Sequence, residues 1–258
     1  MRHALIRCLA ASVITFGVIA APAAARSPDV HYVPTPNNVV NRMLELVKPK
    51  PGDYLIDLGS GDGRIPITAA KRYGINGHGV DIDPVRISEA QAKAEQAGMT
   101  GKVQFIRADL FETEIGKADI VTLYLLETLN AKLRPRLLNE LRPGTRVVSH
   151  AFSMGDWKPE HHEQVEGRDV YFWIVPARVQ GEWRLQNGSE AEVRLTLTQN
   201  YQEVAGSATV DGRQTRIEQI KLKGADLSFR LGGRDYQGKV EGDNIVPSGK
   251  GDWRAARI

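Results

Sequence analysis

The chain has 258 residues, with 34 basic and 31 acidic side chains and a formal net charge of +3. This near balance argues against strong non-specific binding to nucleic acid, which needs a markedly basic surface. A single cysteine excludes an intramolecular disulfide, and no dense group of cysteines and histidines indicates a metal centre. The one histidine pair, His161-His162, is expected in a turn.

The first 25 residues have the pattern of a bacterial secretory signal peptide. Met1 to Arg7 is basic, Leu9 to Ala21 is apolar, and Ala23 to Ala25 offers small residues for cleavage. The apolar run is short for a membrane-spanning helix, and an inner-membrane anchor over residues 9–25 is the alternative. We therefore expect an exported, periplasmic protein, in which cleavage removes the cysteine and lowers the net charge to +1.

A glycine-rich loop after an apolar strand is the most informative motif of the chain. Residues 54–58 form an apolar run that contains Asp57, and three glycines follow at alternate positions, Gly59, Gly61 and Gly63. Glycine allows a tight turn from strand to helix and leaves no Cβ between the backbone and a ligand. The loop therefore fits a small adenosine-containing ligand.

An acid is expected at the end of the second strand, beside this loop. A helix over about residues 64–72 leads to a short apolar strand, residues 77–83, which contains Asp81 and Asp83. In a strand-helix-strand unit of this size, the acid after the second strand accepts hydrogen bonds from the ribose hydroxyls. Asp81 takes that role, while Asp83 is expected to cap the helix that starts near Pro84.

A third strand ends in an acid in the same way. Residues 103–107 form the strand, and Asp109 follows it. This carboxylate would reach the same crevice from the neighbouring strand, where it can accept from an adenine amino group. The alternative is a solvated turn residue.

The three acids and the loop together resemble the class I S-adenosylmethionine-dependent methyltransferases. Dehydrogenases usually space their glycines G-x-G-x-x-G and bind a phosphate there, so an NAD-dependent oxidoreductase is disfavoured. The resemblance implies S-adenosylmethionine as the cofactor and a Rossmann-like α/β fold, with a seven-stranded, mostly parallel sheet that ends in an antiparallel hairpin. It assigns the cofactor contacts to Asp57, Gly59, Ser60, Gly61, Gly63, Asp81, Asp109 and Leu110.

Three segments narrow the resemblance. Residues 32–35, 57–65 and 137–150 are similar to the mitochondrial ATP synthase c-subunit lysine methyltransferase family. Members of that family methylate protein lysines, which implies a protein lysine as acceptor here, in an envelope or membrane protein; a small-molecule acceptor stays open. Residues 118–126 lack the Asn/Asp-Pro-Pro-aromatic run of methyltransferases that act on amino groups of nucleic acid, so base methylation is disfavoured.

Three side chains are candidates for the acceptor side of the crevice. Methyl transfer mainly requires a positioned, deprotonated nucleophile and the exclusion of water, and an aromatic wall lowers the pKa of a lysine amine by desolvation. Tyr124 and Glu127 are the candidates for this wall, and His150 is a further polar group at the end of the strand over residues 146–150. Each has a structural alternative: packing for Tyr124, helix capping for Glu127 and a satisfied buried histidine for His150.

The rest of the chain is predicted to form β-strands. Residues 164–166 and 169–175 predict a hairpin that completes the first sheet. From about Gly181, short alternating runs separated by turns predict a meander that closes, or nearly closes, into a small barrel. Trp183 and Trp253 are expected to fill its core or its mouth, and stacking on a ligand is the alternative.

The expected organisation is a signal peptide (1–25), a methyltransferase domain (26–178) and a small β-rich accessory domain (179–258). S-adenosylmethionine is made in the cytosol, so an exported location leaves its supply open. The alternative function is therefore a non-catalytic envelope protein that binds its partner through the β-domain.

Overall fold

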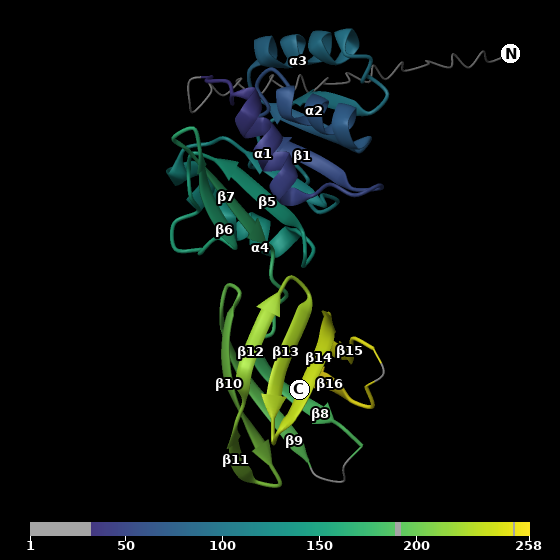
Figure 1. The fold of residues 1–258 in the computed structure, drawn as a ribbon, viewed down its shortest axis with the longest axis vertical. Coiled ribbons are helices and arrows are strands. Elements are labelled where there is room, and N and C mark those ends of the chain that lie inside the picture. The colour runs from purple at the N-terminus through teal and green to yellow at the C-terminus, as the bar shows by residue number, and fades with distance from the viewer. Residues whose placement is uncertain (1–31, 189–191, 250) are drawn as a thin grey trace, which may run out of the picture.

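The computed structural model describes residues 32–188, 192–249 and 251–258. These residues form two structural units, each built on its own β-sheet, that follow one another along the chain (Figure 1). The first is a mixed α/β unit built on a seven-stranded sheet, and the second is a nine-stranded antiparallel sheet. The predicted fold class is confirmed. The expected signal peptide lies outside the described residues.

The first unit has the strand order β3-β2-β1-β4-β5-β7-β6. Strands β1 to β5 pair in parallel, and β7 runs antiparallel to both β5 and β6. Strand order reverses between β1 and β4, so a ligand crevice is expected outside the carboxyl ends of these two strands. The elements are α1 (Asn37–Val47), β1 (Tyr54–Leu58), α2 (Arg64–Tyr73), β2 (Asn76–Asp81), α3 (Pro84–Gln96), β3 (Val103–Arg107), β4 (Ile120–Leu123), α4 (Glu127–Glu140), β5 (Arg146–His150), β6 (His161–Val165) and β7 (Arg168–Ile174).

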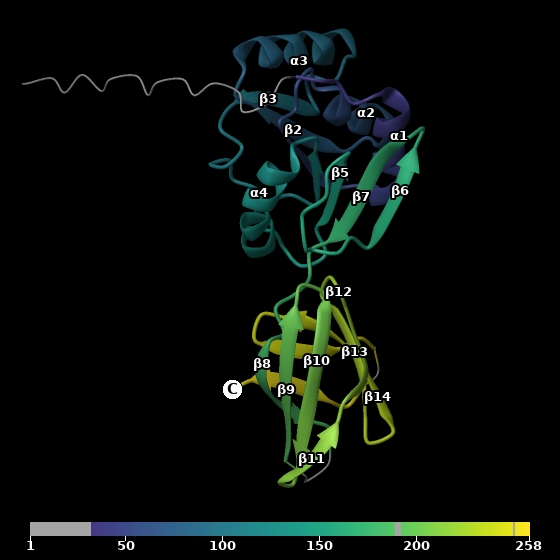
Figure 2. The same cartoon turned by 90° about the vertical axis from the view of Figure 1, so that its left-hand side faces the viewer.

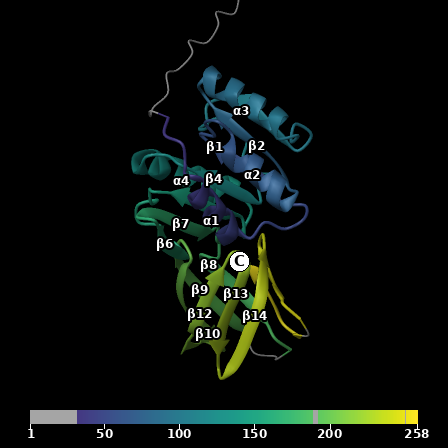
Figure 3. The ribbon, with the colours of Figure 1, turned by 45° about the horizontal axis from the view of Figure 1, so that its top comes forward.

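Helices cover both faces of this sheet, which is why its central strands are buried along almost their whole length. All four residues of β4 are buried, as in other parallel strands that are covered on both sides. On one face, α1 packs over β5 and β7 beside α2, which packs over β1 and β2 (Figure 3). On the other face, Leu133 and Leu137 of α4 pack against Trp157 and Trp173. Helix α1 was not among the predicted elements.

The hairpin that completes the sheet begins earlier than predicted. Strand β6 starts at His161, so the expectation of a turn at His161-His162 is wrong. The chain turns instead at Glu166 and Gly167, both of which have positive φ. Because β6 is an edge strand with polar, half-exposed side chains, it lacks the alternation of apolar residues by which a strand is recognised in a sequence.

The second unit is a meander that nearly closes, with the strand order β11-β10-β9-β8-β16-β15-β14-β13-β12. Trp183 and Trp253 are both buried in its core, as predicted. The four-residue strands β11 and β15 were not predicted. The strands are β8 (Gly181–Gln186), β9 (Val193–Asn200), β10 (Glu203–Val210), β11 (Arg213–Arg216), β12 (Glu218–Lys223), β13 (Asp226–Leu231), β14 (Arg234–Glu241), β15 (Asn244–Pro247) and β16 (Arg254–Arg257).

This second sheet, called the barrel below, packs at the end of the first sheet where β5 begins and β7 ends (Figure 2). The backbone N–H of Ala177 donates to the carbonyl of Gly224 over 2.8 Å. A Cβ on Gly224 would lie 3.0 Å from the Cα of Gly144, so the two backbones approach closely there. The barrel thus lies at the opposite end of β5 from its carboxyl end. Among the described residues, no helix has the length and apolar character needed to cross a bilayer.

Candidate active site

A cleft of about 560 Å³ lies at the carboxyl ends of the parallel strands, where the strand order reverses between the paired strands β1 and β4. It is lined by eight of the residues that the sequence pointed to: Asp57, Gly59, Ser60, Gly61, Asp81, Asp109, Leu110 and Tyr124. Three further candidates, Gly63, Glu127 and His150, are not part of the lining. The topology therefore brings together side chains from four strand ends that are distant in the sequence.

The glycine loop has the backbone that its sequence requires. Gly59, Gly61 and Gly63 have φ values of 81°, 52° and 76°, in the left-handed region that favours glycine. The N–H groups of Gly59 and Ser60 both donate to the carbonyl of Val80 over 2.9 Å, which ties the loop to β2. A Cβ on Gly61 would overlap the ring of Tyr32 and project into the cleft, so its absence keeps the cradle open.

Gly63 has a different function from the other two glycines. A Cβ at this position would overlap the ring of Phe105 and lie 2.9 Å from the Cβ of Ala90. Its smallness therefore lets the start of α2 pack against β3 and α3. It shapes the site without lining it.

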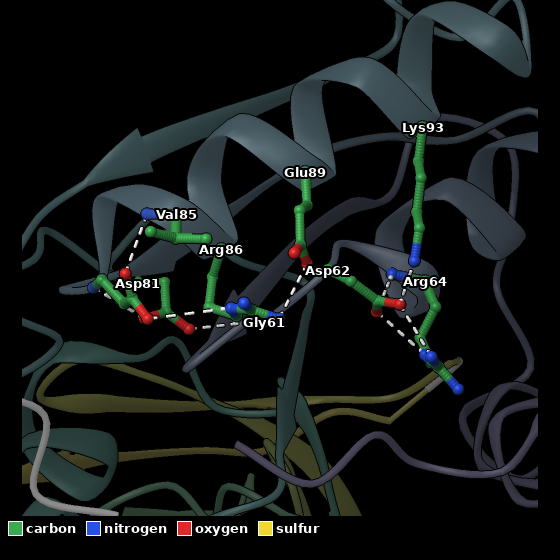
Figure 4. A network of polar contacts seen from close by, with 9 residues as sticks. Gly61, Asp62, Arg64, Asp81, Val85, Arg86, Glu89 and Lys93 are labelled. Carbon is green, nitrogen blue, oxygen red and sulfur yellow. Dashed lines mark hydrogen bonds and ion pairs between the residues drawn. The ribbon is translucent and has the colours of Figure 1, made fainter. Parts of the chain in front are cut away.

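Asp81 is held in a fixed orientation at the end of β2. Its Oδ2 accepts from the N–H of Gly61 and its Oδ1 from the N–H of Asp83, each over 2.9 Å (Figure 4). The remaining lone pairs of the carboxylate are available to the hydroxyls of a ribose in the cleft. Asp83 caps α3 by accepting from the N–H of Val85 over 2.8 Å, as predicted.

Asp109 closes the turn after β3. Its Oδ1 accepts from the N–H of Phe111 over 2.8 Å, and the residue lines the cleft beside Leu110. An acidic acceptor and an apolar side chain thus lie together, at a neighbouring strand end from Asp81. This combination fits an adenine, which offers an amino donor and an apolar ring face.

Asp57 is buried beneath the glycine loop. Burial raises its pKa to about 7, and the nearby Asp81 and Asp62 add to the shift; the Thr122 hydroxyl, which donates to Asp57 over 2.6 Å, acts in the opposite direction. A cationic group in the cleft would favour the ionised form of this carboxyl. The sulfonium and ammonium groups of S-adenosylmethionine are such groups, so Asp57 also fits this cofactor.

Two further features of the cofactor side were not predicted. Asp62 is ion-paired with Arg64 and Lys93, and although burial alone would raise its pKa, these hydrogen bonds hold it well below its ordinary value. The segment from Tyr32 to Thr35 crosses the loop, held by a 2.8 Å hydrogen bond from Arg64 to the Thr35 carbonyl. The sequence marked residues 32–35 through the family resemblance alone and gave no role for them.

The acceptor side of the cleft is aromatic and aliphatic. The ring of Tyr124 lies 3.9 Å from that of His150 and 6.3 Å from that of Phe152, measured between centroids. Phe152, Leu126 and Leu129 line the cleft with Tyr124, and Phe152 was not predicted. No period or motif marks Phe152, because it lies in a loop.

His150 and Glu127 support this wall from outside the cleft. The Nδ1 of His150 is 3.1 Å from the hydroxyl of Thr35, and burial lowers the pKa of this imidazole to about 4, with a smaller contribution from Arg168. The histidine is therefore neutral at pH 7. Glu127 lies in the first turn of α4 and accepts from the Ser153 hydroxyl over 2.5 Å. Catalytic roles for Tyr124 and Glu127 stay predictions.

The fold and the site together define a class I S-adenosylmethionine-dependent methyltransferase, and comparisons with known proteins agree. The family model described as the ANTKMT methyltransferase domain matches residues 57–161. A protein-lysine N-methyltransferase of Saccharolobus islandicus (strain REY15A) is 45% identical over 153 residues, covering 57% of this chain and 95% of the relative. The chain therefore belongs to the same methyltransferase family as this relative.

Further relatives are similar over the same half of the chain. An ATP synthase c-subunit lysine N-methyltransferase of Mus musculus is 30% identical over 138 residues, and the match spans 54% of this chain and 55% of the mouse protein. A solved structure, an RNA methyltransferase from Salinibacter ruber in complex with S-adenosyl-L-homocysteine, is 50% identical with a TM-score of 0.56. That match covers 57% of this chain and 96% of the other. These two matches cover almost all of the Saccharolobus and Salinibacter proteins but little more than half of this chain.

Proposed function

We propose that this methyltransferase transfers the methyl group of S-adenosylmethionine to the side-chain amine of a protein lysine. The observation that carries the proposal is the 45% identity to the archaeal protein-lysine N-methyltransferase across 95% of that protein. The mouse relative is also a lysine methyltransferase by name. The Salinibacter relative is named an RNA methyltransferase, so the charge of the cleft has to distinguish the two acceptors.

The cleft is acidic, which favours a lysine over a nucleic acid. Its lining contains five aspartates and two arginines. Asp62 is neutralised by its ion pairs with Arg64 and Lys93, Asp83 pairs with Arg86, and the raised pKa leaves Asp57 only partly ionised at pH 7, so the excess negative charge comes mainly from Asp81 and Asp109. A negative cleft attracts an ammonium group and repels the phosphates of RNA. The electrostatics therefore support a cationic side chain as acceptor.

The apolar wall supports the chemistry that a lysine needs. When bound, S-adenosylmethionine supplies an electrophilic methyl group: the carbon–sulfur bond breaks with its electron pair going to sulfur while the carbon–nitrogen bond forms. The amine has to lose its proton first. Desolvation against Tyr124, Leu129 and Phe152 lowers the pKa of the amine, so that its proton passes to water at the mouth of the cleft. The wall then holds the amine in line for displacement.

We further propose that the protein is exported and that its acceptor is an envelope or membrane protein. The basic, apolar and small-residue pattern of residues 1–25 supports a signal peptide, and a membrane anchor over residues 9–25 is the alternative. Fusion of residues 1–40 to alkaline phosphatase, which is active only after export, tests this part. Activity in the fusion supports export, and cleavage after about residue 25 separates a signal peptide from an anchor.

Transfer of a radioactive methyl group tests the acceptor. The full chain is incubated with tritiated S-adenosylmethionine in two parallel reactions. One contains the protein fraction of a bacterial extract, and the other contains its RNA. We expect label in protein, recovered as methyl-lysine after acid hydrolysis, and none with Asp81→Ala. Label in RNA alone would replace lysine by a nucleotide acceptor.

A further inference from the structure

The barrel contacts one segment of the methyltransferase unit through the end of the hairpin between β9 and β10, where Glu203 also lies 3.9 Å from Lys158. The segment is residues 151–158, after β5, and the tip is Tyr201 and Gln202, between β9 and β10. The Tyr201 hydroxyl donates to Asp156 over 3.0 Å, and its ring stacks on Trp157 with centroids 6.1 Å apart. Tyr201 has a φ of 55°, which is rare for a residue with a side chain and marks the turn between β9 and β10.

Gln202 makes two further hydrogen bonds to the segment over residues 151–158. The indole N–H of Trp157 donates to its Oε1 over 3.0 Å, and its amide N–H donates to the Lys158 carbonyl over 2.7 Å. The Trp157 side chain is 1% exposed, so its N–H needs a partner within the protein. The barrel supplies that partner. Trp157 therefore forms its buried environment with residues from both units.

The same segment forms part of the acceptor wall at its other end. Phe152 lines the cleft beside Tyr124, and the Ser153 hydroxyl donates to Glu127. Between the two ends, α4 holds the segment through Asn130, which donates to the carbonyls of Phe152 and Ser153 over 3.1 Å each. Arg134, one turn further along α4, donates to the Met154 carbonyl over 2.6 Å. The hairpin tip and the acceptor wall are thus ends of one continuous hydrogen-bonded structure.

Arg134 is shared between the helix, the segment and the barrel. Its guanidinium pairs with Asp156 and lies 5.5 Å from the centroid of the Tyr201 ring. Asp156 accepts from both Arg134 and Tyr201, so loss of Tyr201 leaves this carboxylate, whose side chain is 72% exposed, with one partner fewer. A helix of the methyltransferase unit and a residue of the barrel thus meet at the same carboxylate of the segment.

We propose that Tyr201 and Gln202 are positioning residues: the barrel fixes residues 151–158, and through them the Phe152 wall, and so sets the affinity for the methyl acceptor without reaching the cleft. The proposal rests on the methyltransferase function for its kinetic consequence. The match to the Saccharolobus relative covers 95% of that protein but 57% of this chain, and the family model matches residues 57–161, which lie before the barrel.

Hydrogen exchange of the full chain tests the structural part. The variant Tyr201→Phe with Gln202→Ala removes the hydroxyl and the amide but keeps the stacked ring. Tyr236→Phe is the matched control, because it removes a tyrosine hydroxyl that bonds Asn187 within the barrel. We expect about tenfold faster exchange in peptides covering residues 124–130 and 151–158 in the double variant and no change there in the control. A change confined to residues 156–158, or the same change in the control, would overturn the proposal.

Transfer kinetics test the functional part, with the bacterial protein extract as acceptor. We expect the double variant to need about fivefold more extract for half-maximal transfer, with little change in the maximal rate or in the Kd for S-adenosylmethionine. A purely structural loss would lower all three and would contradict positioning. If the wild type transferred no methyl group to protein, the proposed function would fail while the exchange result still decided whether the barrel positions the wall.

Discussion

The two sides of the cleft are built in different ways. On the cofactor side, aspartates at strand ends and backbone N–H groups hold one another, so the chain geometry itself creates the recognition surface. On the acceptor side, loop and helix side chains form an apolar wall, and buried polar residues support it from behind. The first arrangement suits one invariant ligand. The second can change with the acceptor while the fold stays the same.

Replacing Asp81 should have the largest effect, confined to the cofactor side. Asp81→Ala removes the ribose acceptor and the hydrogen bonds to Gly61 and Asp83, so we expect affinity for S-adenosylmethionine to fall about 100-fold. The stabilisation that S-adenosylmethionine gives to wild type in thermal unfolding should then disappear. Asp119→Ala is the control: its carboxylate accepts from the N–H of Tyr54 and pairs with Arg142 outside the cleft lining, so the variant should cost about 1 kcal/mol of stability and retain the ligand-induced shift.

Gly61 offers a second, smaller test of the cofactor side. Gly61 and Gly74 both have positive φ, at 52° and 70°, but only a Cβ on Gly61 meets another group, the ring of Tyr32. Gly61→Ala should weaken binding of S-adenosylmethionine about 30-fold, whereas Gly74→Ala should cost about 1 kcal/mol of stability and leave binding unchanged. Calorimetric titration distinguishes the two. Equal binding by both variants would mean that the loop does not form the cradle.

Variants of Tyr124 test whether the acceptor side of the cleft can be changed without affecting cofactor binding. Tyr124→Ala should lower kcat/KM for the acceptor about tenfold while the Kd for S-adenosylmethionine changes less than about twofold. Tyr124→Phe keeps the wall but loses the hydroxyl, so it should retain activity unless that hydroxyl handles the proton. A parallel loss of cofactor affinity in Tyr124→Ala would show that the two sides are one unit.

The smallest expected effect is a pH dependence of cofactor binding. Because burial raises the pKa of Asp57 from 3.8 to about 7, the folded protein holds this proton more tightly than the unfolded chain. The resulting stability is fully present below pH 3.8 and is lost as pH rises through about 7. A cationic ligand prefers the ionised carboxyl, so affinity for S-adenosylmethionine should rise about fivefold between pH 6 and 8.

Calorimetry in two buffers with different ionisation enthalpies measures the proton released by Asp57. Asp57→Asn should abolish both the release and the pH dependence. Thr122→Val removes the hydroxyl that donates to Asp57 and should shift the dependence to higher pH. An unchanged pH profile in Asp57→Asn would assign it to another group.

The same contrast explains what could be predicted from the sequence. Asp57, Asp81 and Asp109 follow apolar strands at recognisable spacing, and parallel strands bring their ends together, so these three residues could be placed at one site. The helix cap at Asp83 could also be predicted, because capping depends only on residues that are neighbours in the sequence. The roles of Gly63 in helix packing and of Asp62 in an ion-paired cluster depend on contacts between elements, which spacing does not reveal.

The acceptor wall and the barrel contact were beyond such reasoning. Phe152 and Trp157 lie in a loop without periodicity, and their positions depend on Asn130, Arg134 and Gln202, which follow no local pattern. Glu127 was a candidate for the wall, yet its carboxylate bonds Ser153 outside the cleft lining. Side chains that meet only through tertiary packing carry no signal in a single sequence.

If three strand-end aspartates and the glycine loop form the site for S-adenosylmethionine, calorimetric titration of the wild-type chain should detect it. We expect saturable binding at one site per chain, competed by S-adenosylhomocysteine and lost in Asp81→Ala. Absence of binding, or binding that Asp81→Ala leaves intact, would contradict this assignment of the site.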